Sequence, residues 1–336
     1  MRPASAQAPA PAGAAPIQVA SIGGLHFGGE VRTLSGLPVR EVQTAAGGPI
    51  RRLDVNGDFL VGQMYAQYVK LANPRARHPL MLWHGGGLSG TCWEDTPDGR
   101  TGWQSFFLRQ GHDTWVSDAF ERGRASWPRF PEFIQEEPLF RTLREAWLTF
   151  RFGAEDGWAL DPARRRPFPG QRFPVDAIEN LGRQAIPRWT TTNPQIQAAY
   201  DAYLQRVGPA VIIVHSQGCN FAFQAAINAP DRVAAIVAVE ASGAPDPARA
   251  EVARARGIPI LYVWGDYMDQ GPWPAFRRTV DRFMEAHRAA GGRGDVLDLP
   301  ARGIRGNSHM IMHDDNSDEV AALIQAWLGE RGLMRG

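Results

Sequence analysis

Cysteine is scarce in this chain of 336 residues, and the two cysteines, Cys92 and Cys219, have no metal-ligand spacing. So few thiols do not report the redox compartment. The two could pair in an oxidising location, but the sequence favours two separate buried thiols. The eight histidines form no HExxH or similar pattern, so we expect no metal site.

An excess of charge and long apolar runs are also missing. The formal net charge is +1, which gives no reason to expect nucleic acid or an acidic membrane as a partner. No apolar run approaches the roughly 20 residues that a helix needs to span a bilayer. Hydrophobic residues make up 44% of the chain, enough for a sizeable core, and the length is normal for an α/β enzyme with insertions.

The first 16 residues contain little besides proline, alanine and glycine. Such a segment cannot bury apolar surface, so we expect a disordered leader over 1–16. Ala4-Ser5-Ala6 and Ala6-Gln7-Ala8 resemble the cleavage sites of exported proteins, although no apolar segment precedes them. Two interpretations stay open. One is a trimmed export signal on a periplasmic or secreted protein, and the other is a plain disordered leader on a cytoplasmic one.

The remainder, 17–336, is expected to form one catalytic domain in which strands and helices alternate. This alternation predicts a mostly parallel sheet with helices on both faces. The stretch 119–195 interrupts the rhythm and is rich in Trp, Phe, Pro and Arg, so we expect an inserted lid or cap there. The expected strands are 17–32, 50–70, 78–83, 113–118, 211–214, 233–239, 258–264 and 295–299. The expected helices are 101–110, 139–150, 196–207, 219–229, 273–290 and 316–330.

A serine at a sharp corner is the most informative feature of the chain. The β-branched run 211–214 ends shortly before Ser216, Gly218 follows, and a helical segment comes next. A buried strand that turns into a helix at a serine is typical of a nucleophile elbow, which exposes the hydroxyl beside a helix N-terminus. The first glycine of the usual G-x-S-x-G pattern is replaced by Val214, which implies a wider corner or argues against the assignment.

A serine hydroxyl is a weak nucleophile until a base takes its proton, and the usual base is a histidine oriented by a carboxylate. His309 lies in a loop after the last expected strand, where it can reach the carboxyl edge of the sheet. His313 is a rival closer to the final helix. His287 lies within a helical run, where we expect a surface residue.

Two carboxylates compete to orient that histidine. Glu240 ends the strand 233–239, and Asp266 follows the next strand. Asp266 could instead cap a turn. A glutamate at the end of an apolar central strand is costly without a partner, which favours a functional role for Glu240.

An oxyanion hole requires backbone N–H groups beside the nucleophile. One is expected from Gln217, directly after Ser216. The other is expected from Gly86, in the glycine loop that follows the strand ending at Trp83.

In these residues the chain resembles an α/β-hydrolase, and more narrowly a small group of bacterial serine esterases with a Ser–Glu–His triad whose acid follows the sixth strand. The resemblance implies Ser216 as nucleophile, Glu240 as the orienting acid and His309 as base, with Gly86 giving one oxyanion N–H. Most superfamily members would have the acid at the place of Asp266. Related esterases have a cysteine pair where this chain has Gly86 and Gly87, so no redox-sensitive loop is expected. The matching residues are His84-Gly85, Thr96-Pro97-Asp98-Gly99-Arg100, Gly102-Trp103, Arg122-Gly123-Arg124, Ser126, His215-Ser216-Gln217, Glu240 and Gly306-Asn307-Ser308-His309.

The leading functional hypothesis is hydrolysis of a small carboxylic ester with an apolar or aromatic moiety, through an acyl-enzyme and without a cofactor. The aromatic residues of 119–195 suggest that moiety, although they could equally form the core of the insertion. Lactonase, thioesterase, amidase and acyltransferase activities would use the same triad. A non-catalytic binding protein on this scaffold is disfavoured, because no triad member is missing. A homodimer stays open.

Overall fold

The computed structural model describes residues 15–248 and 250–335, so residues 1–14 of the expected leader lie outside the described part. Eight strands form one sheet in the order β1-β4-β6-β5-β7-β8-β9-β10. The six strands from β6 to β10 are parallel, and β4 and β1 add an antiparallel pair at one side. Their bounds are β1 Val19–Leu34, β4 Gly57–Leu71, β5 Leu80–Trp83, β6 Thr114–Asp118, β7 Ala210–His215, β8 Val233–Val239, β9 Ile260–Trp264 and β10 Gly294–Asp298.

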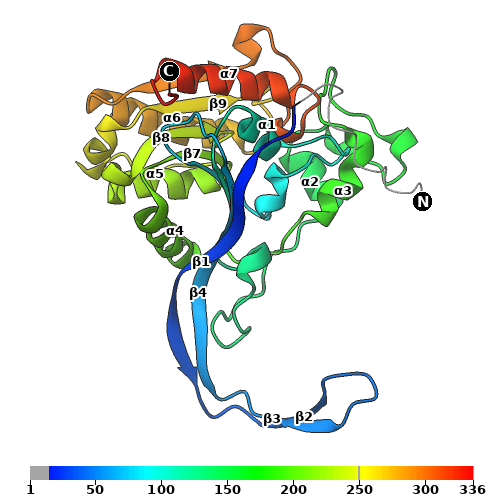
Figure 1. The fold of residues 1–336 in the computed structure, drawn as a ribbon. Coiled ribbons are helices and arrows are strands. Elements are labelled where there is room, and N and C mark those ends of the chain that lie inside the picture. Colours follow the sequence, from blue (N-terminus) through cyan, green and yellow to red (C-terminus); the bar gives the residue numbers. More distant parts are fainter. Residues whose placement is uncertain (1–14, 249, 336) are drawn as a thin grey trace.

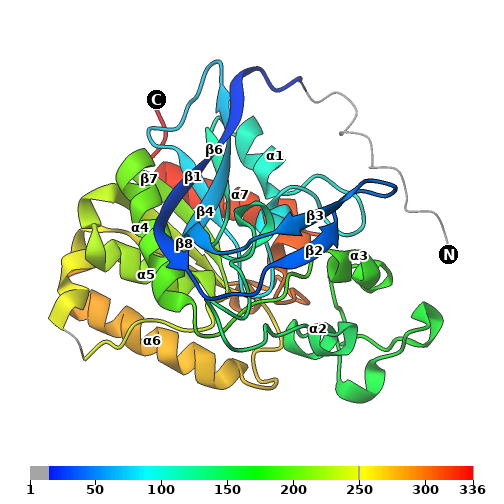
Figure 2. The same ribbon diagram turned by 90° about the horizontal axis from the view of Figure 1, so that it is seen from below.

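Helices cover both faces of the sheet, as the alternation predicts (Figure 1). One hydrophobic core lies under α4 (Asn193–Val207), α5 (Gly218–Asn228) and α6 (Trp273–Ala289), which Figure 2 shows together on one side. The second core lies under α1 (Trp103–Arg109) and α7 (Ser317–Glu330), with α2 (Leu143–Thr149) and α3 (Ile178–Arg183) beside them. The described residues contain no helix both long and apolar enough to cross a membrane.

The central strands form where the sequence is continuously apolar. Every residue of β5 and β7 is buried, and β8 is buried at all but one position. Strands that are covered on both faces are expected to have such runs. Because β7, β8 and β9 are parallel neighbours, their carboxyl ends lie side by side at one edge of the sheet. The candidate residues follow those ends.

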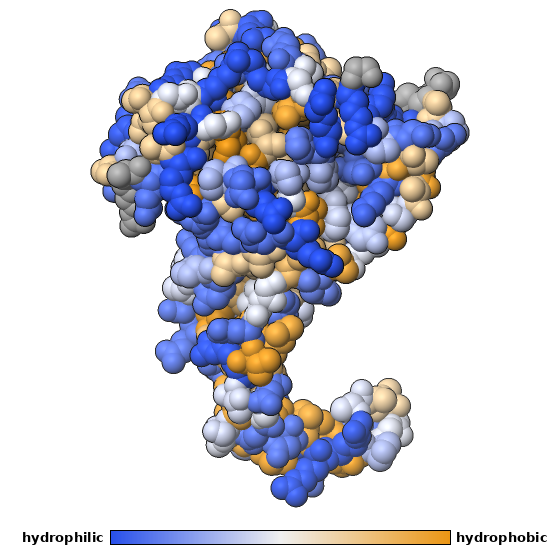
Figure 3. All heavy atoms as spheres, turned by 60° about the vertical axis from the view of Figure 1, so that its left-hand side comes forward, coloured by the Kyte–Doolittle hydropathy of each residue, from blue (hydrophilic) through white to orange (hydrophobic). Residues whose placement is uncertain are grey.

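A β-arm, residues 28–63, extends from the body (Figure 1). In it β1 and β4 pair with each other past the carboxyl end of β6, and β2 (Arg40–Gln43) and β3 (Ile50–Leu53) form a ribbon at the tip. The expected continuous strand 50–70 was wrong, because a turn held by Asn56 and the Asp54 carboxylate separates β3 from β4. Figure 3 shows apolar surface on the arm, where Val31, Ile50 and Leu60 are exposed.

The inserted stretch 119–195 has little regular structure. The helix expected over 139–150 forms as α2, and α3 follows before the chain returns to α4. A short antiparallel bridge joins Leu139 to Arg188, so the two halves of the stretch contact each other. The remaining pieces are the 3-10 turns Gly123–Ala125, Glu155–Gly157, Pro162–Arg164 and Val175–Ala177.

Candidate active site

Ser216 lies at the corner between β7 and α5, partly exposed among buried neighbours. Its φ is 54°, in the left-handed region that residues other than glycine rarely adopt. The Ser216 N–H donates to the Val239 carbonyl over 3.0 Å, which holds the corner on the next strand. Backbone strain of this kind is typical of a nucleophile elbow.

The corner also shows how the chain accommodates Val214. A β-carbon on Gly218 would lie 2.8 Å from Cγ2 of Val214 and 2.6 Å from the carbonyl oxygen of His84. Both approaches are closer than real β-carbons make. The missing side chain on the helix side of the corner therefore leaves the room that Val214 takes on the strand side.

His309 and Glu240 meet although 69 residues separate them, with 3.1 Å between His309 Nδ1 and Glu240 Oε2. The Nδ1–H donates to the carboxylate, which leaves Nε2 as the lone-pair nitrogen. The His309 ring is fully buried, with its centroid 4.2 Å from that of Trp273 and 4.4 Å from that of His215. The histidine is thus held in the tautomer and orientation that a general base needs.

Glu240 is fully buried and has a partner for each carboxylate oxygen. Its Oε1 accepts a hydrogen bond from the Gly265 N–H, and its Oε2 forms an ion pair with Arg151 at 2.7 Å besides contacting His309. Its φ is 54°, so two neighbouring strands end in left-handed residues, Ser216 and Glu240. Burial of a carboxylate is costly unless it is paired, and Arg151 supplies the charge.

Asp266, the alternative acid, has different partners. Its carboxylate accepts hydrogen bonds from the backbone N–H groups of Tyr267, at 2.9 Å, and Gly306, at 3.0 Å. It therefore organises the loops at the end of β9, and the structure pairs His309 with Glu240.

The other predicted residues lie elsewhere. His313 is buried and donates from Nε2 to the Cys92 carbonyl at 3.0 Å. His287 is also buried, against the Ala255 carbonyl, so its expected surface position was wrong. It lies on the inward side of α6, which a helical run alone does not reveal. Cys92 and Cys219 are both free and buried.

The glycine loop approaches the serine closely. A β-carbon on Gly85 would lie 2.9 Å from the Ser216 β-carbon, and one on Gly86 would lie 2.6 Å from Gln217 Oε1. Among the described residues, neither the Gly86 N–H nor the Gln217 N–H donates to another protein group. Two free donors beside a partly exposed serine are the elements of an oxyanion hole.

The electrostatics favour neutral His309. Burial lowers its pKa well below the usual value, and the positive charges of Arg151 and Arg141 lower it further. The imidazole is therefore unprotonated at neutral pH and able to accept a proton. Ser216 Oγ has no hydrogen-bond partner in the described part of the chain, so its contact with His309 is not formed in this structure. Such contacts often tighten only when substrate is bound.

Sequence reasoning missed the contacts by which two residues hold this arrangement. Arg151 lies in the insertion, where no motif indicates a role. His215 directly precedes Ser216, and its Nε2–H donates to the His309 carbonyl at 2.9 Å. Its position beside the serine was visible in the sequence, but its contact with His309, 94 residues later, was not.

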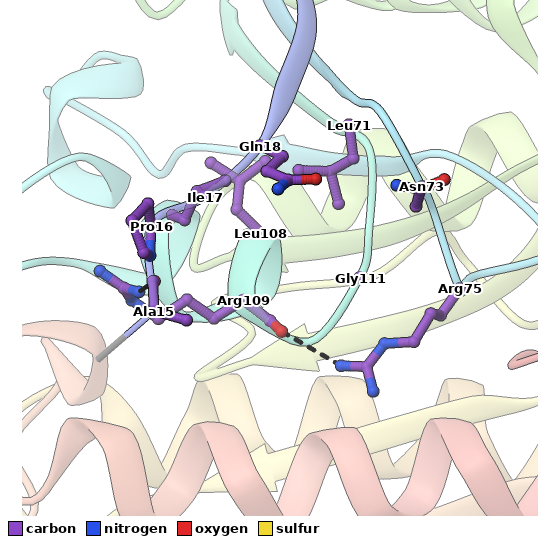
Figure 4. A pocket seen from close by; sticks show the side chains of 10 residues that line it. All are labelled: Ala15, Pro16, Ile17, Gln18, Leu71, Asn73, Arg75, Leu108, Arg109 and Gly111. Atoms are coloured by element: carbon purple, nitrogen blue, oxygen red, sulfur yellow. Dashed lines mark hydrogen bonds between the residues drawn. The ribbon is translucent and has the colours of Figure 1, made fainter. Parts of the chain in front are cut away.

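Two cavities of several hundred Å³ have none of the candidate active-site residues in their lining. One, of about 490 Å³, lies at the opposite edge of the sheet and is lined by residues such as Leu71 and Arg109, whose carbonyl accepts from Arg75 (Figure 4). The other, of about 440 Å³, lies between the base of the β-arm and α4. In the described residues, no cluster of three or more His, Cys, Asp or Glu could hold a metal ion.

Known proteins share this architecture. No family model matches the chain. It is 25% identical over 343 residues to the "Probable secreted lipase phiG" of Fungal sp. (strain ATCC 74256), covering 82% of this chain and 90% of the relative. It is 33% identical to a solved "Novel Bacterial Esterase", with a TM-score of 0.79, covering 95% of this chain and 98% of that one.

The fold and the likeness to the bacterial esterase define the class: the chain belongs to the α/β-hydrolase superfamily. This confirms the expected α/β-hydrolase fold and superfamily. More particularly, the chain is a hydrolase enzyme whose relatives include an esterase and a lipase.

Proposed function

We propose that this protein hydrolyses carboxylic esters through Ser216. His309 takes the hydroxyl proton as Ser216 attacks the ester carbonyl, and the Gly86 and Gln217 N–H groups bind the oxyanion. Collapse of the tetrahedral intermediate breaks the ester bond, and His309 gives the proton to the leaving alcohol. Water, deprotonated by His309, then attacks the acyl-enzyme and releases the acid and Ser216.

The pairing of His309 with Glu240 carries this proposal. A buried histidine that donates from Nδ1 to a paired carboxylate retains a basic Nε2 and an imidazolium-stabilising partner. The ring lies at the same edge of the sheet as Ser216 because the His215 side chain holds the His309 carbonyl.

We also propose that the insertion 119–195 acts as a lid. Several of its aromatic residues are buried in the two hydrophobic cores of the molecule, with Trp147, Phe152 and Phe173 in one and Trp189 in the other, whereas Trp127 and Phe140 are exposed. The buried aromatic residues therefore fix the insertion on the body, and the exposed ones are available to an apolar substrate.

The test is Ser216→Ala. The variant is expected to lose essentially all turnover of a short-chain aryl ester, such as 4-nitrophenyl butyrate, with an unchanged thermal unfolding midpoint. A fluorophosphonate probe should label the wild-type protein and leave the variant unlabelled. Labelling of Ser216→Ala at the wild-type rate would refute the assignment of the nucleophile.

Export from the cytoplasm is a further part of the proposal, supported by the relative that is named a probable secreted lipase. Fractionation of cells expressing the complete natural gene tests it. Activity that stays with the cytoplasmic fraction would contradict export without touching the proposed chemistry.

A further inference from the structure

Two arginines flank the loop that holds Gly86 and Gly87. Arg188 Nε lies 3.5 Å from the point where a β-carbon on Gly86 would stand, and Arg141 Nη1 lies 3.5 Å from the equivalent point on Gly87. Arg141 Nη1 also donates to the Gly86 carbonyl at 3.4 Å. Two guanidinium groups therefore border the proposed oxyanion loop.

Both arginines are held in place by the backbone of the insertion. Leu139 and Arg188 exchange two backbone hydrogen bonds, of 2.7 and 3.1 Å, and Arg141 lies two residues beyond Leu139. The Ile186 N–H donates to the Gly87 carbonyl at 2.9 Å, which ties the segment before Arg188 to the glycine loop. These hydrogen bonds fix the backbone segments from which the Arg141 and Arg188 side chains extend.

Their positive charges are poorly compensated by the protein. Among the described residues, the Arg188 guanidinium forms no ion pair or hydrogen bond. Burial and the charge of Arg141 lower its pKa, and the more distant carboxylates of Glu121 and Glu145 offset only part of that shift. Arg141 has one acidic partner, Glu145, at 3.4 Å, with a half-exposed carboxylate. By contrast, the buried Arg151 is paired with Glu240 at 2.7 Å.

The Phe150 ring contacts both Arg141 and His309, the proposed base. The Arg141 guanidinium lies 4.8 Å from the Phe150 ring centroid, and the Phe150 and His309 centroids are 5.4 Å apart. An anion beside Arg141 would therefore lie close to the reacting groups. Arginine suits this task because its planar fork matches a carboxylate in two hydrogen bonds.

We propose that Arg141 and Arg188 form a subsite for a carboxylate carried by the substrate, so that the preferred esters are anionic. This rests on the proposed ester hydrolysis. The carbonyl of such an ester lies at the Gly86 N–H while its carboxylate, a few bonds away, binds the two guanidiniums. The substrate carboxylate then gives the two guanidinium groups a close anionic partner, which Arg188 lacks among the described residues.

Two matched pairs of esters test this preference. The carboxylate is on the alcohol side in 4-acetoxybenzoate, for which 4-acetoxybenzamide is the neutral partner. It is on the acyl side in 4-nitrophenyl hydrogen adipate, for which 4-nitrophenyl heptanoate is the neutral partner. For the wild-type protein, kcat/KM should favour the anionic member of at least one pair by about tenfold to a hundredfold, the size of a charged hydrogen bond.

The variants are Arg188→Gln and Arg141→Gln, with Arg188→Lys to retain the charge. Both glutamine variants should lose the preference, mainly through KM, whereas the lysine variant should keep part of it. Arg188→Gln, whose side chain makes no hydrogen bond to the described part of the glycine loop, should also keep kcat/KM for the neutral ester within about threefold. Arg144→Gln is the matched control, because Arg144 is exposed and pairs with Glu155 on the outside of the same segment. Its anion preference should equal that of the wild-type protein.

Two results would overturn the subsite. One is equal or lower activity on the anionic member of both pairs. The other is a fall in kcat/KM by the same factor on anionic and neutral esters in the glutamine variants. That result would mean that the guanidiniums stabilise the oxyanion of the tetrahedral intermediate and not a carboxylate of the substrate. A wild-type protein that hydrolyses none of the four esters, and whose Ser216 is not labelled by fluorophosphonate, would instead contradict the proposed function.

Discussion

The Glu240 carboxylate shows how one residue is fixed by its surroundings. It is fully buried, yet Arg151, His309 and the Gly265 N–H together satisfy its charge and hydrogen bonds. Arg151 in turn donates from Nε to the Asp266 carbonyl and lies 4.5 Å from the Trp273 ring centroid. The arginine therefore connects the insertion to the ends of β8 and β9 and pairs with the proposed acid.

The two candidate acids should separate by mutation. Glu240→Gln is expected to lower kcat by about a thousandfold or more, because the neutral amide no longer stabilises the imidazolium or fixes the tautomer. Asp266→Asn should change kcat by less than about tenfold, since Asp266 bonds backbone groups of its own loops. Steady-state kinetics on a neutral aryl ester, with thermal unfolding as the check on folding, measures both. A larger loss for folded Asp266→Asn would make Asp266 the acid.

At the scale of elements, the corner between β7 and α5 is a packing unit. The strand contributes a valine where the usual pattern has glycine, and the helix contributes Gly218, whose missing side chain makes room for it. The same close approach brings the His84 carbonyl against the start of α5.

Gly218→Ala should therefore destabilise the protein by about 1–3 kcal/mol, the cost of overpacking a rigid core. The combination with Val214→Ala should restore only part of this loss, because the His84 carbonyl belongs to the backbone and cannot move aside. Urea unfolding measures the free energies. Gly329→Ala, in α7 with nothing within 4 Å, is the control and should be neutral or slightly stabilising. A Gly218→Ala variant as stable as this control would contradict the packing account.

Elements differed in how far the sequence could predict them. The strand expected over 233–239 matches β8, because a continuous apolar run has no competing interpretation. The expected strand 50–70 breaks into β3 and β4, because alternation continues across a turn whose hydrogen bonds join Asn56 to Asp54 and Leu37. Alternation of apolar and polar residues indicates which way side chains point, and it carries no information about hydrogen bonds within a turn.

On the scale of the whole molecule, buried histidines should make stability depend on pH. Burial lowers the pKa of His84 and His313 to about 4, and lowers the pKa of His215 and His309 well below the usual value. The unfolded chain binds protons at these histidines as pH falls below about 6.5, while the folded chain does not. Protons therefore favour unfolding across that range.

The thermal unfolding midpoint should accordingly fall as pH drops from about 7 to about 4.5. Asp314 acts in the opposite sense, because burial raises its pKa to about 7 and the folded state binds a proton there first. Four other carboxyls with raised pKa values act in the same sense as Asp314, and two other histidines with lowered pKa values add to the four above; they are Glu94, Glu121, Asp201 and Asp318, and His112 and His287. The histidines outnumber the carboxyls, so we expect the net effect to keep its sign. Differential scanning fluorimetry at constant ionic strength measures the midpoint, and a midpoint that rises on acidification would contradict this account.

A homodimer stays a prediction that analytical ultracentrifugation can decide.

The sequence by itself determined the strands and helices that follow the β-arm, the serine corner, the glycine loop and the late histidine. These are local features, written in apolar runs and in residues adjacent along the chain. The tertiary structure decided the partner of His309 and the positions of Arg141, Arg151 and Arg188. Those contacts join the insertion 119–195 to distant strand ends, and they depend on how the chain packs, which local periodicity does not encode.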